Sequence, residues 1–182
     1  MIMFNRRKFY VLVILTIFFA FAAYVFYMVE QDNFHTVTPG EAYRSAQFDG
    51  EKLTYYIRRY NIRSILNLRG ANPDSVWYRE ELRVSAANRI NHYDVTLTST
   101  KELTRNDVKK LIEIFKSAPK PILIHCQSGA DRTGVVAAMW KVIVDHESKS
   151  EAEKQLSIFY GHVPLGGRYA MDKFFEKWQP SN

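Results

Sequence analysis

The stretch that decides the fold is His125-Cys126-Gln127-Ser128-Gly129-Ala130-Asp131-Arg132-Thr133-Gly134. It follows the apolar run Pro121 to Ile124 and precedes an apolar helical segment, Val135 to Val144. A loop that curls between a strand and a helix can point successive backbone N–H groups at an anion. The segment therefore predicts a phosphate-binding loop whose N–H groups come from Gln127, Ser128, Gly129, Ala130, Asp131 and Arg132.

The loop begins with Cys126, the only cysteine in the chain. Backbone N–H dipoles and a helix N-terminus lower a thiol pKa from ~8.5 toward ~3.5–7.5, so we expect Cys126 to act as a thiolate nucleophile. The planar fork of Arg132 can bind two phosphate oxygens at the loop mouth. We expect Thr133 to hydrogen-bond the departing thiolate, and His125 to fix Cys126 through the backbone rather than act as a base.

A single cysteine excludes an internal disulfide and a metal site built from several thiolates. Cys126 therefore has to be explained on its own. Outside the three basic residues that precede the apolar N-terminal run, 22 basic residues face 19 acidic ones. No stripe of Lys and Arg interleaved with aromatic residues occurs there, so nucleic acid is not an expected partner.

Alternating apolar runs and amphipathic segments predict an α/β fold. We expect buried strands at 64–68 and 121–124 and an alternating strand at 91–97. Helix-start spacings of Thr104 with Asp107 and of Ser150 with Glu153 predict helices to about residues 117 and 160, and a last helix covers 169–178. Such strand and helix units favour a mostly parallel central sheet flanked by helices, with ligands beyond the carboxyl ends of the strands.

The N-terminal segment contains 21 residues, Phe9 to Val29, without a charge, Gly or Pro. At ~1.5 Å per residue, a helix of this length spans the ~30 Å hydrocarbon core. A cleaved signal peptide and a buried core helix are the alternatives. The apolar run is longer than a typical signal core, and bulky residues follow its small ones, which favours an uncleaved anchor.

Charge asymmetry predicts the orientation of this anchor. Arg6, Arg7 and Lys8 precede it, whereas Glu30 and Asp32 follow it. We expect a basic cytoplasmic N-terminus (1–8), a transmembrane helix (9–29), a linker (30–40) and a catalytic domain (41–182). That domain would lie outside the cytoplasm, in the periplasm of a Gram-negative cell.

The loop resembles the signature of the cysteine-dependent protein tyrosine and dual-specificity phosphatases: His-Cys, five residues, Arg, then Ser or Thr. Tyr43-Arg44-Ser45-Ala46-Gln47 and Asn67-Leu68-Arg69-Gly70 more loosely resemble elements of compact bacterial members. The resemblance covers roughly residues 41–178. It implies a two-step reaction through a phosphocysteine intermediate that needs no metal and no cofactor. Arg44 and Arg69 would either contact a second phosphate or serve the structure.

The general acid is the open position in this comparison. Many members of the family carry it as Asp on a separate loop about thirty residues before the Cys, but 98–102 contains no Asp. Asp131 is preferred, because repulsion from a bound phosphate dianion raises a carboxyl pKa. Its alternative role is a helix cap or a partner of Arg132. Asp94 and Glu102 remain candidates.

The predicted function is hydrolysis of a phosphate monoester. Phosphotyrosine or phosphoserine protein, a membrane lipid phosphate and an inositol phosphate all suit a domain tethered to a membrane. Two other classes remain open: a phosphate-binding module without turnover, and a sulfurtransferase that uses the same cysteine.

Overall fold

The structure, a computed structural model, describes residues 6–30 and 32–180, without the side chains of residues 25–30. It divides into two compact units, Met1–Gln31 and Asp32–Asn182. The first contains helix α1 (Arg6–Glu30), whose apolar window, Arg6–Tyr24, is not buried against protein. By length and composition, α1 could be a membrane span or a signal sequence. Residues 1–5 of the predicted cytoplasmic segment lie outside the described residues.

The second unit is built on a five-stranded sheet of order β1-β2-β5-β3-β4. Three of its strands, β3 (Ser64–Asn67), β4 (Asn91–Asp94) and β5 (Ile122–His125), lie where the sequence predicts strands. β2 (Ala42–Ser45) pairs with β5 in parallel, and β1 (His35–Thr38) joins β2 as an antiparallel edge. The mostly parallel sheet confirms the predicted fold class.

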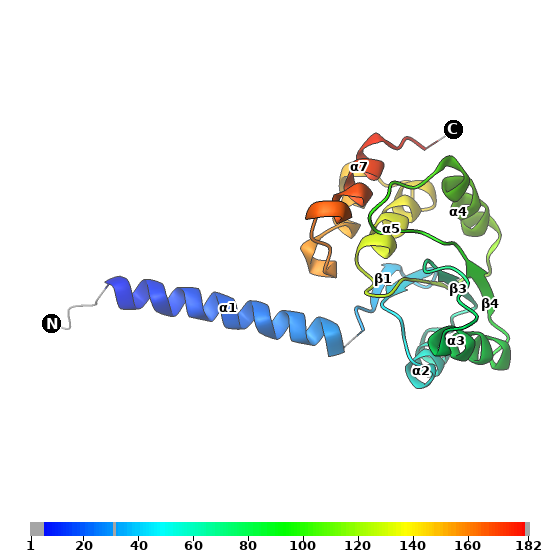
Figure 1. The fold of residues 1–182 in the computed structure, drawn as a ribbon, viewed down its shortest axis with the longest axis horizontal. Helices are drawn as coiled ribbons and strands as arrows, with labels where there is room; N and C mark the ends of the chain where they lie inside the picture. The colour runs from blue at the N-terminus through cyan, green and yellow to red at the C-terminus, as the bar shows by residue number, and fades with distance from the viewer. Residues whose placement is uncertain (1–5, 31, 181–182) are drawn as a thin grey trace. The chain divides into compact units, whose positions relative to one another are not determined.

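Helices cover both faces of this sheet (Figure 1). α2 (Gly50–Tyr60) and α3 (Val76–Ala87) lie on one face, and α4 (Arg105–Ser117), α5 (Asp131–Ile143) and α7 (Ala170–Lys177) lie on the other. Successive strand residues alternate between the two cores, because side chains along a strand point to opposite faces. Leu123 packs on the α2 and α3 side, whereas Ile122 and Ile124 pack on the α5 side.

The predicted helix starts have different outcomes. Thr104 and Asp107 form the expected capping box at the start of α4. The single helix predicted from Ser150 to Tyr160 is wrong: Ser148 caps a short helix, α6 (Lys149–Ala152), and two 3-10 turns follow, η1 (Glu153–Gln155) and η2 (Ile158–Tyr160). A buried arginine of β2 binds the backbone and side-chain oxygens of Gln155, which holds the chain in this irregular path.

The globular unit begins earlier than the predicted boundary at residue 41. Strand β1 lies within the predicted linker, residues 30–40, and its Val37 is buried. The side chain of Asn33 donates hydrogen bonds to the backbone oxygens of Ser128 (3.0 Å) and Tyr160 (2.9 Å). These contacts fix the start of the unit to residues about a hundred positions away. The polar segment before residue 41 is therefore an ordered part of the domain and not a linker.

Candidate active site

The predicted phosphate loop lies at the carboxyl end of β5, in the middle of the sheet. Cys126 follows β5 directly and is 1% exposed, and α5 begins at Asp131. Gly129 has φ +70°, and a Cβ there would lie 2.6 Å from the backbone carbonyl carbon of Ser45. Only glycine tolerates this close approach to the end of β2.

Two loop carbonyls bind residues outside the loop. The backbone N–H of Gln47 donates to the oxygen of Gln127 at 3.1 Å. Asn33 donates to the oxygen of Ser128, as described above. Because a trans peptide places its carbonyl and the next N–H on opposite sides, the N–H groups of Ser128 and Gly129 point away from these partners.

Arg44 holds the next two carbonyls. Its guanidinium is fully buried and donates from Nη2 to the oxygens of Gly129 (2.8 Å) and Ala130 (3.4 Å). It also lies 4.0 Å from the ring centre of Tyr160. Burial lowers the pKa of Arg44 to about 10, which still leaves the side chain charged at neutral pH. Arg44 therefore braces the loop and does not face a ligand.

The four N–H groups of residues 128–131 consequently point away from the residues that bind the loop carbonyls. Among the described residues, none of these four groups has a hydrogen-bond acceptor. Unpartnered N–H groups at the start of a helix form an anion site. This arrangement suits the non-bridging oxygens of a phosphate.

Arg132 lies on the first turn of α5 and is half-buried. Its Nη1 approaches the backbone oxygens of Leu68 (3.5 Å) and Leu97 (3.4 Å), and no carboxylate of the described chain pairs with it. Its Nε and the hydroxyl of the buried Thr133 have no hydrogen-bond partner among the described residues. Both side chains thus retain unused polar atoms beside the loop, as their predicted roles require.

His125 is buried and bonds the backbone, as its predicted supporting role requires. Its Nδ1 donates to the oxygen of Cys126 at 3.2 Å, and its Nε2 lies 3.2 Å from Oε2 of Glu81. Glu81 also accepts hydrogen bonds from Gln47 and His92. Burial alone would raise the pKa of Glu81, but the charge of His125 and the hydrogen bonds of His92 and Gln47 lower it below its usual range.

Sequence reasoning missed Glu81, although a signal was present. Glu81 lies three residues after Tyr78 and three before Val84, and all three are buried on one stripe of α3. A carboxylate on an apolar helical stripe is rarely buried without partners. The position of Glu81 on this stripe therefore predicts a buried polar network behind the loop.

Asp131 is buried at the start of α5 and is held by other side chains. Its Oδ1 lies 2.8 Å from Nδ1 of His162, and its Oδ2 lies 3.8 Å from Nε of Arg168. Nε2 of His162 lies 3.0 Å from Asp172. Burial would lower the pKa of His162, but hydrogen bonds and charges from both aspartates outweigh it and raise this pKa.

The other candidate acids are also bonded to neighbours. Asp94, at the end of β4, accepts from Asn67 at 2.8 Å and from the hydroxyl of Tyr78. Glu102 is exposed and pairs with Lys177 at 2.9 Å. The structure thus places Asp131 in the phosphate loop itself, and its role as acid stays a prediction.

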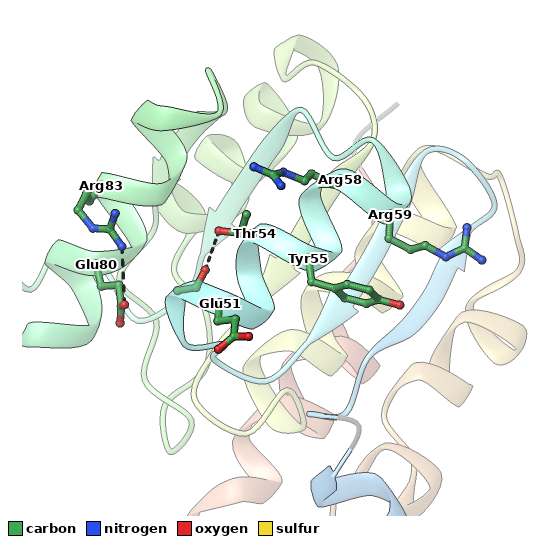
Figure 2. Close-up of a pocket in the computed structure, with 8 residues that line it drawn as sticks. Glu51, Thr54, Tyr55, Arg58, Arg59, Glu80 and Arg83 are labelled. Carbon is green, nitrogen blue, oxygen red and sulfur yellow. Dashed lines mark hydrogen bonds and ion pairs between the residues drawn. The ribbon is translucent and has the colours of Figure 1, made fainter.

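A surface cavity of about 770 Å³ lies along α2 and α3 (Figure 2). Three arginines line it, together with Glu51 and Glu80, and Glu80 lies 3.9 Å from Arg83. None of the predicted site residues lines this cavity. With three arginines against two glutamates the cavity is mildly basic, and its residues come from α2 and α3 and not from the phosphate loop.

The model of one protein family matches residues 17–165, and it describes a DSP-PTPase phosphatase fused to NAD+ kinase. The chain belongs to this family. It is therefore a phosphatase of the cysteine-dependent, dual-specificity type, as the loop signature predicted.

Solved structures share the fold of this phosphatase. The catalytic core of the PP-IP phosphatase SIW14 from S. cerevisiae, solved with citrate, is 27% identical over 81% of this chain and 85% of that one, with a TM-score of 0.66. TpbA from P. aeruginosa is 18% identical over 82% and 87%, with a TM-score of 0.60, and a variant of it was solved with pTyr. PTPMT1 is 13% identical over 79% and 94%, with a TM-score of 0.57, and was also solved with PI(5)P.

Proposed function

We propose that this phosphatase hydrolyses phosphate monoesters by transferring the phosphoryl group first to Cys126 and then to water. The observation that carries this proposal is the outward orientation of the loop carbonyls at 127–130, which leaves four N–H groups unpartnered. Such groups bind the non-bridging oxygens with no reorganisation during the reaction. Phosphate would then be held beside the sulfur of Cys126.

In the first step, the thiolate of Cys126 attacks phosphorus, an S–P bond forms and the P–O bond to the leaving group breaks. The leaving oxygen takes a proton from a general acid, for which Asp131 is the preferred residue. The Nε donor of Arg132, which has no partner among the described residues, binds an equatorial oxygen as charge spreads over the phosphoryl group. No metal is required for this charge stabilisation, because the guanidinium and the N–H groups provide it.

In the second step, water attacks phosphorus, the S–P bond breaks and inorganic phosphate leaves. The proton lost by water passes to the base form of the same acid. The hydroxyl of Thr133 donates to the departing thiolate. His125 keeps Cys126 in place through its bond to the backbone, and the buried Glu81 orients the His125 ring.

The substrate class is proposed as phosphoprotein or a membrane lipid phosphate. TpbA was solved with pTyr and PTPMT1 with PI(5)P, and the same fold therefore accepts both kinds of ligand. The substrate screen described below separates these two classes.

We also propose that residues 9–29 anchor the phosphatase, with residues 1–8 in the cytoplasm and the catalytic domain on the other side. The positive charges before the apolar run support this orientation. Protease treatment of intact and permeabilised cells that express the full chain tests it. The proposal predicts that protease reaches the domain from outside once the outer barrier, if present, is opened; cleavage of the domain only after lysis would contradict the orientation.

Turnover of an aryl phosphate tests the chemistry. The full chain in detergent should hydrolyse it, Cys126→Ser should abolish hydrolysis, and a chelator should leave the rate unchanged. Binding of phosphate without turnover in the unchanged chain would indicate a binding module, and a persulfide at Cys126 after thiosulfate would indicate sulfur transfer. Phosphate release from phosphopeptides, phosphoinositides, phosphatidylglycerophosphate and lipid A then separates the substrate classes.

A further inference from the structure

We propose that Arg69, stacked on Trp77, forms a second anion-binding site beside the phosphate loop, and that it takes a second phosphate group close to the scissile one. The proposal deepens the proposed function and rests on it. It assigns to this chain a preference for substrates that carry two neighbouring phosphates, whether on a lipid head group or on a soluble molecule.

The backbone of Arg69 is placed next to the loop by its neighbour Leu68. The N–H of Leu68 donates to the oxygen of His125 at 2.9 Å, and the oxygen of Leu68 lies 3.5 Å from Nη1 of Arg132. Arg69 therefore follows a residue that contacts both the start and the end of the signature.

The turn that carries Arg69 is fixed by a buried side chain. Oδ1 of Asn67 accepts from the N–H of Arg69 at 2.9 Å, and its Nδ2 donates to the oxygen of Gly70 at 3.0 Å. Gly70 has φ +74°, and a Cβ there would lie 2.0 Å from the hydroxyl of Thr96. The chain thus keeps a glycine and a buried amide at this turn, and both hold the position of Arg69.

The guanidinium of Arg69 is held by uncharged groups. Its Cζ lies 3.6 Å from the centre of the Trp77 ring, and its Nη1 donates to Oε1 of Gln47 at 3.4 Å. Gln47 is fixed in turn by its hydrogen bond to Glu81. Stacking on indole orients a guanidinium and leaves its donors free. Within the described chain, no carboxylate forms an ion pair with Arg69 and only one of its five side-chain N–H groups has an acceptor.

Arg69 does not hold backbone segments together in the way that Arg44 does. The guanidinium of Arg44 is fully buried and donates to four oxygens, whereas that of Arg69 is partly exposed and keeps most of its donors. Burial and the positive charge of Arg132 lower the pKa of Arg69, against the charges of Glu81 and Cys126. The guanidinium groups of Arg69 and Arg132 repel each other, and neither has a carboxylate partner among the described residues. A ligand with two negative groups would therefore stabilise both.

Calorimetric titration of Cys126→Ser protein, as the full chain in detergent, with inorganic phosphate and with pyrophosphate tests the site. A second charge-assisted contact predicts that pyrophosphate binds about tenfold to a hundredfold more tightly than phosphate. Adding Arg69→Gln should bring the two dissociation constants to within about threefold, while the affinity for phosphate changes little. Retained phosphate binding shows that the loop of this variant is intact.

Arg58→Gln is the matched control, because Arg58 is exposed in the surface cavity of Figure 2 and its replacement removes the same charge. It should leave the ratio of the two constants unchanged. An unchanged ratio in Arg69→Gln, or an equal fall in Arg58→Gln, overturns the proposal. Trp77→Leu should lower the ratio in part, since it removes the platform and leaves the charge. Because the titration needs no turnover, absence of catalysis in the unchanged chain would count against the proposed function and not against this site.

Discussion

Nδ1 of His162 lies 2.8 Å from Oδ1 of Asp131, which is the residue beside Arg132 in the phosphate loop. His162 is buried, and its other ring nitrogen faces Asp172 at 3.0 Å. A carboxylate offers only acceptors, so a histidine between two carboxylates donates to both when it is charged. Asp131 is thus both a candidate acid and one end of a buried polar cluster.

Asp131→Asn tests the first of these roles. A general acid typically increases the rate by about 10²–10⁴-fold, so the rate on an alkyl phosphate should fall by a factor in that range. The rate on an aryl phosphate should fall less, because its good leaving group needs little protonation. Steady-state kinetics on both substrates gives the ratio of the alkyl phosphate rate to the aryl phosphate rate, which should fall in this variant. Asp172→Asn, which keeps the carboxyl of Asp131, is the control and should leave the ratio near that of the unchanged chain.

An unchanged alkyl phosphate rate in Asp131→Asn would remove Asp131 from the mechanism. The same kinetics on Asp94→Asn and Glu102→Gln would then examine the remaining candidates. The bonds of Asp94 to Asn67 and Tyr78 suggest that its replacement also lowers stability, so unfolding is measured alongside the rates.

The raised pKa of His162 predicts how stability depends on pH. A proton bound more tightly in the folded state stabilises it fully below the unfolded pKa of ~6.5, and this contribution is lost as the pH rises through the folded pKa. Urea unfolding of the full chain at a series of pH values should therefore show falling stability above pH ~6.5. His162→Gln should lack this component; an identical pH dependence in the two proteins would contradict it.

Glu81→Ala tests the network behind His125. Removing one partner of a buried ion pair costs about 3–5 kcal/mol, and the loss of the carboxylate also frees Gln47 and the His125 ring. Urea unfolding at neutral pH gives the free energy, and Glu80→Ala, at the neighbouring and partly exposed position, is the control, with less than about 1 kcal/mol expected. Equal costs at the two positions would show that the network contributes nothing.

The lowered pKa of Glu81 also predicts how the stabilisation by its carboxylate changes with pH. The charged form is favoured by the folded state, so the contribution is present above the unfolded pKa of ~4.3 and is lost as the pH falls through the folded pKa. The stability difference between the unchanged chain and Glu81→Ala should therefore shrink in acid.

The phosphate loop was predictable because its determinants are local. A strand, a glycine-containing loop and a helix follow one another between residues 122 and 143, and the residues of each are enough to predict it. The partners of the loop are not local: Asn33 bonds a residue 95 positions away, and Arg44 bonds one 85 positions away. A polar segment and a strand that contains a buried arginine give weak strand patterns, and β1 and β2 were missed for that reason.

The helix predicted from Ser150 failed for a related reason. Its residues have helical spacing, but Gln155 binds the buried guanidinium of Arg44, and Gly161 takes a φ of +75°. Tertiary contacts outweigh the intrinsic helix preference of a short segment. The buried stripe of α3 predicts that Glu81 has polar partners, but only the folded chain shows which residues they are. His162 has no such local signal, because both of its partners lie on other elements.

The proposed reaction requires Cys126 to carry the phosphoryl group during turnover. Rapid acid quench of the full chain with an aryl phosphate, followed by intact-mass and peptide mass spectrometry, tests it most directly. A transient addition of one phosphoryl group, located on Cys126 and absent in Cys126→Ser, is the expected result. Turnover at the normal rate with Cys126 unmodified at every quench time, or turnover retained in Cys126→Ser, would exclude Cys126 as the nucleophile.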